Sequence, residues 1–364
     1  MGTATTAPIK VLVVDDSAFM RKTLSGMLEG DPRVAVVGVA RNGEEGVQKV
    51  AELHPDVVTM DVEMPGMDGI EALKRIMAIN PVPVIMVSSL TEEGAKETLT
   101  ALDLGAVDYI PKHLEGVVTN ITALQQELIA KVMAAAGAIG KLRRRAATSG
   151  SPPQAEKTAK KDFVALTSSS VSATRGSKVV AIGCSTGGPQ ALQEVLPLFP
   201  ENFPAGILIV QHMPKFFTKP FADRMSQQCR IEVREAKEGD VVTPGVALVA
   251  PGGSHMRVVR RRALDMDIVL SPNHENLPYV PSVDVLMRSI AEVYHARGIG
   301  VILTGMGQDG LEGMKAIKEA KGRTLAQDEA TCVVYGMPKA VVDAGYAEKV
   351  MPVSQLTGEI MNMI

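Results

Sequence analysis

Short apolar runs alternate with amphipathic segments through both halves of the chain. The runs are almost continuously hydrophobic, whereas segments such as 17–30 and 310–320 carry apolar residues at helical spacing. Apolar strands joined by helices predict a parallel sheet covered on both faces, and therefore an α/β fold in each half. The predicted strands are residues 11–16, 35–40, 56–61, 83–89 and 108–112, followed by 179–185, 205–212, 245–251, 267–271, 300–305 and 324–328.

The middle of the chain breaks this alternation. Residues 141–178 are rich in Ser, Thr, Ala and Lys, and carry 9 Lys+Arg against 2 Asp+Glu. Such a stretch buries too little apolar surface to offset the entropy of ordering it, so a flexible basic linker is predicted. We therefore expect one domain over 1–130, a helix end and linker over 131–178, and a second domain over 179–364.

Composition narrows the class of protein. The 364 residues include 38 Lys+Arg and 41 Asp+Glu, and the net charge of -3 argues against a general nucleic-acid binder. Cys184, Cys229 and Cys332 have neither disulfide-framework nor zinc-ligand spacing, which favours a reducing compartment. No apolar run approaches the roughly 18 residues that span a bilayer, and the N-terminus lacks a signal-peptide pattern. We expect a soluble cytoplasmic protein.

Polar side chains follow the predicted N-terminal strands at the point where each strand ends. Asp15 and Asp16 end the first run, Asp61 the third, and Ser88 the fourth, while Lys112 follows the last. Because these ends share one edge of a parallel sheet, the carboxylates should repel one another unless a cation neutralises them. Oxygen ligands with open positions suit Mg²⁺. One carboxylate could then accept a phosphoryl group, with Lys112 and a hydroxyl neutralising its charge.

Each of these residues has a plainer interpretation when it is taken singly. An aspartate or serine after a strand is commonly a helix N-cap or a turn residue. The ordered set at successive strand ends is much harder to obtain by chance, and it favours a functional site.

A glycine-rich turn follows the predicted strand 179–185. Ser185 stands in GCSTGGPQ, where Gly183 and Gly187 permit the tight geometry of a GxSxG nucleophile elbow. The helix that follows would aim its backbone N–H groups and dipole at an oxyanion. Glycine-rich turns also bind phosphate, although this one lacks the GK[ST] of a P-loop and the spacing of GxGxxG. The turn alone leaves both interpretations open.

A histidine and an aspartate at other strand ends favour the serine nucleophile. His212 ends one predicted strand, and Asp309 follows another. A serine needs a base to accept its proton, and the base needs a carboxylate to fix its tautomer. The order Ser–His–Asp differs from that of α/β-hydrolases, so that fold does not follow. His255, which also follows a predicted strand, is a rival base.

The first 125 residues or so resemble the receiver domain of two-component response regulators. The resemblance rests on VLVVDDSAFMRKTL, VVTMDVEMPGMDGIEAL, VIMVSS and GAVDYIPK. It implies a flavodoxin-like fold and phosphorylation that depends on Mg²⁺. The implied roles are Asp61 as phosphoacceptor, Asp15 and Asp16 as acidic metal ligands beside it, the carbonyl of Glu63 as a further ligand, Ser88 as the switch hydroxyl and Lys112 as the phosphate partner.

The second domain resembles the chemotaxis protein-glutamate methylesterases, the CheB family, over essentially its whole length. The matching strings are GCSTGGPQAL, VQHMP, APGGSHM, SVDVLMRSIA, ILTGMGQDG and AQDEATCVVYGMP. The resemblance implies a doubly wound, mostly parallel α/β domain. The implied roles are Ser185 as nucleophile, His212 as base, Asp309 as orienting acid, Thr186 and the backbone of Met306 beside the oxyanion, and His255 near the pocket without a triad role.

This resemblance implies a phosphorylation-regulated serine hydrolase. It would remove methyl esters from glutamate side chains of methyl-accepting chemoreceptors and deamidate receptor glutamines, with a chemotaxis histidine kinase as phosphodonor. The ester hydrolysis would need no cofactor, and neither nucleic acid nor membrane insertion is expected. We further expect the receiver to cover the site until Asp61 is phosphorylated. The alternatives are a response regulator with a DNA-binding output domain and one with a nucleotide-binding output domain.

Overall fold

The structure is a computed structural model that describes residues 7–112, 121–148, 177–261, 266–272 and 277–364. Most of the predicted linker therefore lies outside the described residues. None of the described helices is long and apolar enough to cross a membrane.

The N-terminal domain is a five-stranded parallel sheet in the order β2-β1-β3-β4-β5. Apolar side chains alternate between its two faces, so that α2, α3 and α4 bury one face while α1 and α5 bury the other. Helices α1 to α4 each begin at a polar N-cap whose side chain accepts a backbone N–H. The elements are β1 (Ile9–Val14), α1 (Ala18–Glu29), β2 (Val34–Ala40), α2 (Gly43–Leu53), β3 (Val57–Asp61), α3 (Gly69–Ile79), β4 (Val84–Ser88), α4 (Glu92–Asp103), β5 (Asp108–Pro111) and α5 (Ile121–Thr148).

The C-terminal domain contains a seven-stranded parallel sheet in the order β14-β13-β12-β6-β7-β9-β8. Helices α6, α7 and α11 cover one face, and α8, α9 and α10 cover the other. Its elements are β6 (Val179–Cys184), α6 (Gly188–Val195), η1 (Leu196–Leu198), β7 (Gly206–Gln211), α7 (Lys215–Gln228), β8 (Glu232–Glu235), β9 (Val246–Val249), β10 (His255–Arg260), β11 (Met266–Ser271), α8 (Val283–Tyr294), η2 (His295–Arg297), β12 (Gly298–Ile302), α9 (Leu311–Glu319), β13 (Arg323–Gln327), α10 (Met337–Asp343), β14 (Lys349–Met351) and α11 (Val353–Met363).

One predicted strand lies outside the parallel sheet. The run 267–271 falls in β11, which pairs antiparallel with β10 in a separate hairpin. The reason is the short connection between the two strands, because a parallel pair needs a crossover of about a dozen residues or more. The other predicted strands lie in the two parallel sheets.

The strand order places the candidate residues at the two topological switch points. In the first sheet, β2 lies on one side of β1 and β3 lies on the other. The connections that follow β1 and β3 therefore diverge and leave a crevice between the ends of these two strands. The corresponding crevice in the second sheet lies between β6 and β12. Ser185 follows β6, and Asp309 follows β12 after a loop of several residues.

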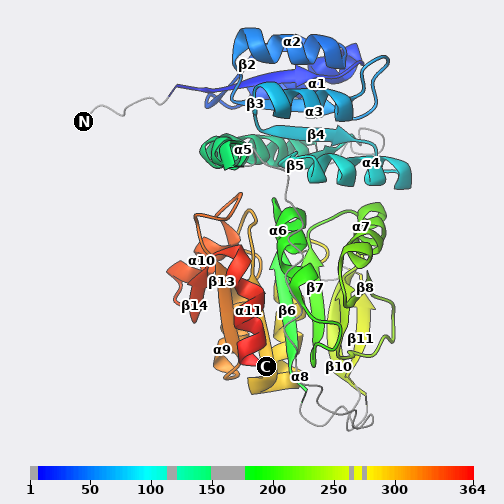
Figure 1. Cartoon of the computed structure of the whole chain (residues 1–364), viewed down its shortest axis with the longest axis vertical. Helices are drawn as coiled ribbons and strands as arrows, with labels where there is room; N and C mark the ends of the chain where they lie inside the picture. The colour runs from blue at the N-terminus through cyan, green and yellow to red at the C-terminus, as the bar shows by residue number, and fades with distance from the viewer. Residues whose placement is uncertain (1–6, 113–120, 149–176, 262–265, 273–276) are drawn as a thin grey trace, which may run out of the picture.

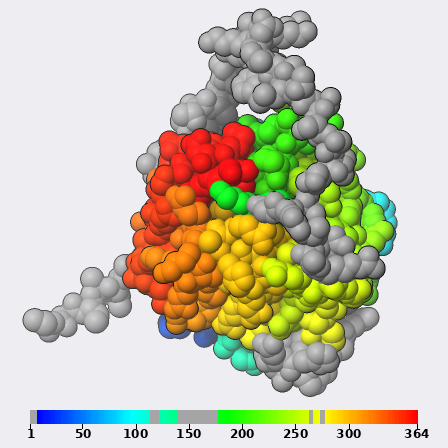
Figure 2. All heavy atoms as spheres, turned by 90° about the horizontal axis from the view of Figure 1, so that it is seen from below, coloured from blue at the N-terminus to red at the C-terminus, as the bar shows by residue number. Residues whose placement is uncertain are grey.

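The two domains are packed against each other. Figure 1 shows the N-terminal domain as an upper layer whose α4, β5 and α5 face α6 and α7 of the domain below. The ring of Tyr109 on β5 stacks on Phe217 of α7, with centroids 4.6 Å apart, and Arg224 of α7 pairs with Asp103 at the end of α4. Seen from below, the C-terminal domain hides most of the N-terminal domain, whose blue and cyan atoms show only at its edge (Figure 2).

Candidate active site and acidic pocket

Ser185 lies in a tight turn between β6 and α6. Its N–H donates to the carbonyl of Thr304 at 3.1 Å, which ties the turn to the end of β12. Gly187 has φ +76, and a Cβ there would lie 2.6 Å from Val333. A glycine is therefore required by backbone conformation and by space. The serine side chain is half-buried at the start of the helix.

His212 follows β7, the strand next to β6. Its N–H donates to the carbonyl of Cys184 at 3.1 Å, so the histidine and Ser185 emerge from neighbouring strand ends. Nε2 of His212 lies 2.8 Å from Oδ2 of Asp309, and both side chains are nearly buried. Nδ1 is buried and has no hydrogen-bond partner among the described residues. Because Nε2 faces Asp309, Nδ1 is the ring atom left to accept a proton.

Asp309 is held as a charged acceptor. It accepts the N–H groups of Val283 at 2.7 Å and Asp284 at 3.0 Å, and the Ser282 hydroxyl at 2.9 Å. Burial alone would raise the pKa of Asp309, but the hydrogen bond from His212, its charge and the backbone N–H groups hold that pKa below the ordinary value. An ionised carboxylate at this position suits the orienting partner of a basic imidazole.

His255 contacts the residue that holds this acid from the start of α8. It is the first residue of β10, is 2% exposed, and its Nδ1 accepts the N–H of Ser282 at 3.2 Å. Ser282 in turn bonds Asp309, so His255 belongs to the support of the acid. The carboxylate pairs with His212, and this geometry favours His212 over His255 as the base.

Two side chains that the sequence motifs did not identify complete the surroundings of His212. Tyr279 stacks on the imidazole, with ring centroids 4.4 Å apart and planes 4° from parallel. Burial, followed by the charge of Asp309, raises the pKa of Tyr279. The amide of Gln211 donates to the carbonyls of Ser185 at 3.1 Å and His212 at 3.2 Å. It therefore joins the serine turn to the histidine loop.

The residues predicted beside the oxyanion flank Ser185 from two loops. Thr186 follows it directly, and the loop after β12 approaches so closely that a Cβ on Gly305 would lie 2.9 Å from Cβ of Ser185. The N–H groups of Thr186 and Met306 donate to no other residue within the described segments. The Thr186 hydroxyl donates to Oδ2 of Asp108 in the N-terminal domain at 2.5 Å.

The acidic pocket of the N-terminal domain brings together the carboxylates expected from the sequence. Ligand oxygens of Asp15, Asp16 and Asp61 all lie within 4.8 Å of one another. Burial raises the pKa of Asp15, and it raises the pKa of Asp61 to about 6, with the charge of Asp15 adding to the shift and Lys112 opposing it. Oδ2 of Asp15 is buried and has no hydrogen-bond partner among the described residues. An orphaned carboxylate oxygen in a cluster of acids fits a hard divalent cation such as Mg²⁺.

Lys112 and Ser88 take different positions around Asp61. Nζ of Lys112 lies 2.5 Å from Oδ2 of Asp61 and 3.7 Å from Oδ2 of Asp15. The Ser88 hydroxyl is buried and donates to the carbonyl of Gly94 in α4 at 3.2 Å. The lysine is therefore paired with Asp61, while the Ser88 hydroxyl is bonded to α4.

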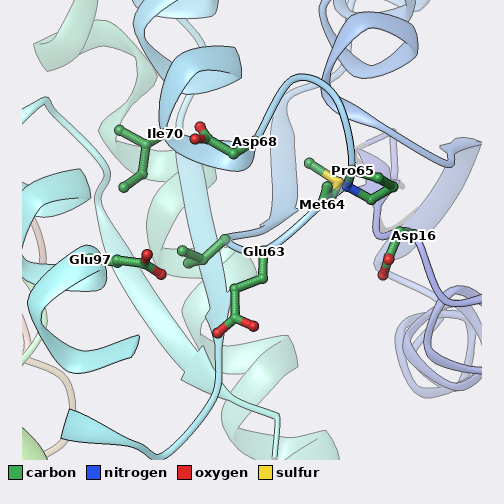
Figure 3. Close-up of a pocket in the computed structure, with 8 residues that line it drawn as sticks. Asp16, Glu63, Met64, Pro65, Asp68, Ile70 and Glu97 are labelled. Atoms are coloured by element: carbon green, nitrogen blue, oxygen red, sulfur yellow. The ribbon is translucent and has the colours of Figure 1, made fainter. Parts of the chain in front are cut away.

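A neighbouring pocket is also lined by carboxylates. Figure 3 shows Glu63 between Asp16 on one side and Glu97 of α4 on the other, in a pocket of about 400 Å³. Burial and the charge of Glu63 raise the pKa of Glu97. The Glu63 N–H donates to Oδ1 of Asp61 at 3.2 Å, which places its backbone next to the acidic cluster.

Comparisons with known proteins identify relatives of both domains. The family described as CheB methylesterase matches residues 180–360, and the response regulator receiver domain matches residues 11–123. A protein of Nitratidesulfovibrio vulgaris named protein-glutamate methylesterase/protein-glutamine glutaminase 2 is 50% identical, with 97% of this chain and 99% of the relative covered. The chain belongs to the CheB methylesterase family.

Other relatives in this family cover the same length. A protein-glutamate methylesterase/protein-glutamine glutaminase 1 of Geobacter sulfurreducens is 45% identical, with 98% of each chain covered. The crystal structure of the Thermotoga maritima CheB methylesterase catalytic domain matches 52% of this chain and 99% of its own, with 39% identity and a TM-score of 0.51. The predicted family and fold class are confirmed, and these relatives offer no support for a DNA-binding output domain.

Proposed function

We propose that this CheB-family chain is a phosphorylation-regulated serine hydrolase that removes methyl esters from glutamate side chains of chemoreceptors and deamidates receptor glutamines. The observation that carries the proposal is the bond between His212 and the ionised Asp309, which leaves Nδ1 of His212 free at the strand end next to Ser185. The names of the full-length relatives supply the substrate class. The free cysteines suit a reducing compartment such as the cytoplasm.

The proposed reaction proceeds through an acyl-enzyme. Oγ of Ser185 attacks the ester carbonyl while Nδ1 of His212 takes its proton, and the imidazolium then protonates the departing methanol. Water then attacks the acyl-enzyme while His212 takes its proton. The imidazolium returns a proton to Oγ of Ser185 as glutamate is released. Asp309 stays ionised and stabilises the imidazolium through Nε2. With a glutamine substrate, the leaving group is ammonia.

Backbone donors stabilise the charge that develops on the carbonyl oxygen. We assign this role to the N–H groups of Thr186 and Met306, which have no other acceptor within the described segments and flank Ser185. One such donor contributes about 10²–10³ in rate where it has been measured. The dipole of α6 adds to this effect, because Ser185 lies just before its N-terminus.

Asp61 is proposed to accept a phosphoryl group from a chemotaxis histidine kinase. Lys112 would pair with the phosphoryl oxygens, and the Ser88 hydroxyl would turn from Gly94 toward them. Asp15, Asp16, Asp61 and the carbonyl of Glu63 would hold Mg²⁺, which offsets charge on the transferring oxygens when it is bound.

The unphosphorylated receiver is proposed to restrain the esterase site. Asp108 of the receiver bonds Thr186, the neighbour of Ser185, and Gln190 of α6 donates to the receiver carbonyl of Ala106 at 2.8 Å. Strand β5 begins at Asp108, and the residue after its end, Lys112, is paired with Asp61. A rearrangement of Lys112 around a phosphoryl group would therefore act on the strand that contacts the serine turn. A shift of a few kcal/mol between two packings is enough for such a switch.

Methanol release from methylated receptor membranes tests the proposed chemistry. The intact chain with Mg²⁺ and a small phosphodonor is expected to release methanol and to leave glutamate. Ser185→Ala should abolish this release, while Ser226→Ala, which changes a serine of α7 whose hydroxyl accepts the N–H of Val233, should retain it. Methanol release by Ser185→Ala at the wild-type rate would overturn the assignment.

A further inference from the structure

Asp309 is fixed by the beginning of a helix that lies before it in the sequence. Its two oxygens accept the Ser282 hydroxyl and the N–H groups of Val283 and Asp284, which form the N-cap and first turn of α8. These donors orient the carboxylate toward Nε2 of His212. The side chain of the acid is therefore placed by α8, although the acid belongs to the loop before α9.

Asp284, in the first turn of α8, accepts hydrogen bonds from the start of α9. Its Oδ1 accepts the N–H of Gly310 at 2.9 Å and the N–H of Gly313 at 2.7 Å, both at the beginning of α9. The N-cap of α9 is Gly310, which has no side chain to cap these donors. Asp284 therefore supplies from α8 the capping acceptor that α9 lacks.

Each aspartate thus accepts a backbone N–H from the helix start next to the other aspartate. Asp309 accepts the N–H of Asp284, and Asp284 accepts the N–H of Gly310, the residue after Asp309. Gly310 has φ +98, and a Cβ there would lie 2.6 Å from Ile302 and 3.0 Å from Val283, so the turn has little room to move. Both the side chain and the following backbone of Asp309 are consequently tied to the first turn of α8.

The same helix turn also touches the strand that carries the nucleophile. A Cβ on Gly183, two residues before Ser185, would lie 2.3 Å from Val283. The first turn of α8 therefore contacts the serine strand through Val283 and the triad acid through its donors. A displacement of this turn would change the separation between the acid, the base and the nucleophile together.

We propose that Asp284 is a positioning residue for the triad, acting through Asp309. This proposal rests on the proposed hydrolase function, because it concerns the alignment of the same triad. Within the described residues, the Asp284 carboxylate accepts hydrogen bonds from Gly310 and Gly313, and none from His212. Without its carboxylate, the Asp309–Gly310 turn would relax and His212 would lose its fixed partner, which slows the chemical step without altering the binding of the receptor segment.

The test compares Asp284→Ala with Asp284→Asn in the full chain, activated with Mg²⁺ and a small phosphodonor. The alanine variant is expected to lower kcat for methanol release about tenfold or more, with KM within about twofold of wild type. The asparagine variant retains an oxygen that can accept both N–H groups, and should stay within about threefold of wild type. Asp240→Ala is the matched control, because Asp240 also caps a turn of this domain by accepting the N–H of Lys237 at 2.7 Å.

Three results would overturn the inference. These are a kcat of Asp284→Ala within twofold of wild type, an asparagine variant as slow as the alanine variant, and an Asp240→Ala variant slowed to the same extent. Labelling of Ser185 by a fluorophosphonate separates this inference from the proposed function. If the wild type is labelled but releases no methanol, the proposed substrate is wrong, and the relative labelling rates of the variants decide the role of Asp284 by the same thresholds.

Discussion

The hydroxyl of Thr186 donates a 2.5 Å hydrogen bond to the carboxylate of Asp108 across the interface of the two domains. Both side chains are buried, and Thr186 directly follows Ser185. Hydrogen bonds to a charged acceptor contribute about 1.5–3 kcal/mol each. This contact is therefore strong enough to affect the balance between a restrained and a released esterase site.

Thr186→Val should weaken the restraint while retaining the shape of the side chain. Because Thr186 is next to Ser185, its substitution can also change the chemical step. The quantity to measure is therefore the rate of methanol release by the unphosphorylated variant divided by the rate of the same variant when phosphorylated. We expect this ratio to rise at least about fivefold, since roughly 1 kcal/mol changes an equilibrium by that factor.

Thr218→Val provides a matched control for this experiment. The Thr218 hydroxyl also donates to a carboxylate, that of Glu235 at 2.6 Å, but both residues lie in the catalytic domain. Its ratio should equal that of the wild type. An unchanged ratio in Thr186→Val, or an equal rise in both variants, would show that the interdomain bond does not restrain the site.

The acidic pocket predicts a pH-dependent effect of Mg²⁺ on stability. The pKa of Asp61 is about 6 in the folded chain, against about 3.9 in an unfolded one. Because the folded state binds this proton more tightly, the stability contributed by protonation is complete below about pH 4 and is lost as the pH rises through 6. The difference corresponds to about 3 kcal/mol.

Mg²⁺ should therefore stabilise the chain more at pH 7.5 than at pH 5. It binds the ionised carboxylates and compensates for their repulsion, so its effect on Tm should be several degrees at the higher pH and near zero at the lower. Thermal melting with and without the ion measures this difference. Asp61→Asn should reduce the Mg²⁺ effect at pH 7.5, and equal shifts at both pH values in the wild type would refute the pocket assignment.

Tyr279 should contribute to the chemical step through its contact with the base. Its ring covers one face of His212 at 4.4 Å, and stacked aromatic pairs contribute about 0.5–1.5 kcal/mol beyond the area that they bury. Tyr279→Ala is expected to lower kcat about threefold to tenfold. Tyr279→Phe retains the ring, so a loss of the same size in Tyr279→Phe would assign the effect to the hydroxyl instead.

The sequence predicted the parts of the fold that depend on local pattern. Apolar runs identified the strands of both parallel sheets, and the residues after them became the candidate sites because such ends share one edge. The apolar pattern of 267–271 predicts a strand of the parallel sheet, but the segment pairs antiparallel with β10. The hydrophobic pattern of this run does not distinguish a strand of the parallel sheet from a strand of a hairpin. The short connection to β10 is the feature of the sequence that indicates the hairpin.

Contacts between distant residues were not predictable from the sequence. Ser282 and Asp284 lie about 25 positions before Asp309, and nothing in their local pattern distinguishes them from an ordinary helix start. Gln211 resembles any polar residue at the end of a strand, yet its amide joins two site loops. The family resemblance implies that Thr186 lies beside the oxyanion, and only the packing of the two domains shows that its hydroxyl contacts Asp108.

Labelling with a fluorophosphonate reports the reactivity of Ser185 without any receptor. We expect the intact, activated chain to be modified at Ser185, as mapped on its peptides, and His212→Ala to reduce the labelling rate by at least about a hundredfold. Labelling at another serine, or labelling of Ser185 that is unchanged in His212→Ala, would contradict activation of this hydroxyl by the imidazole.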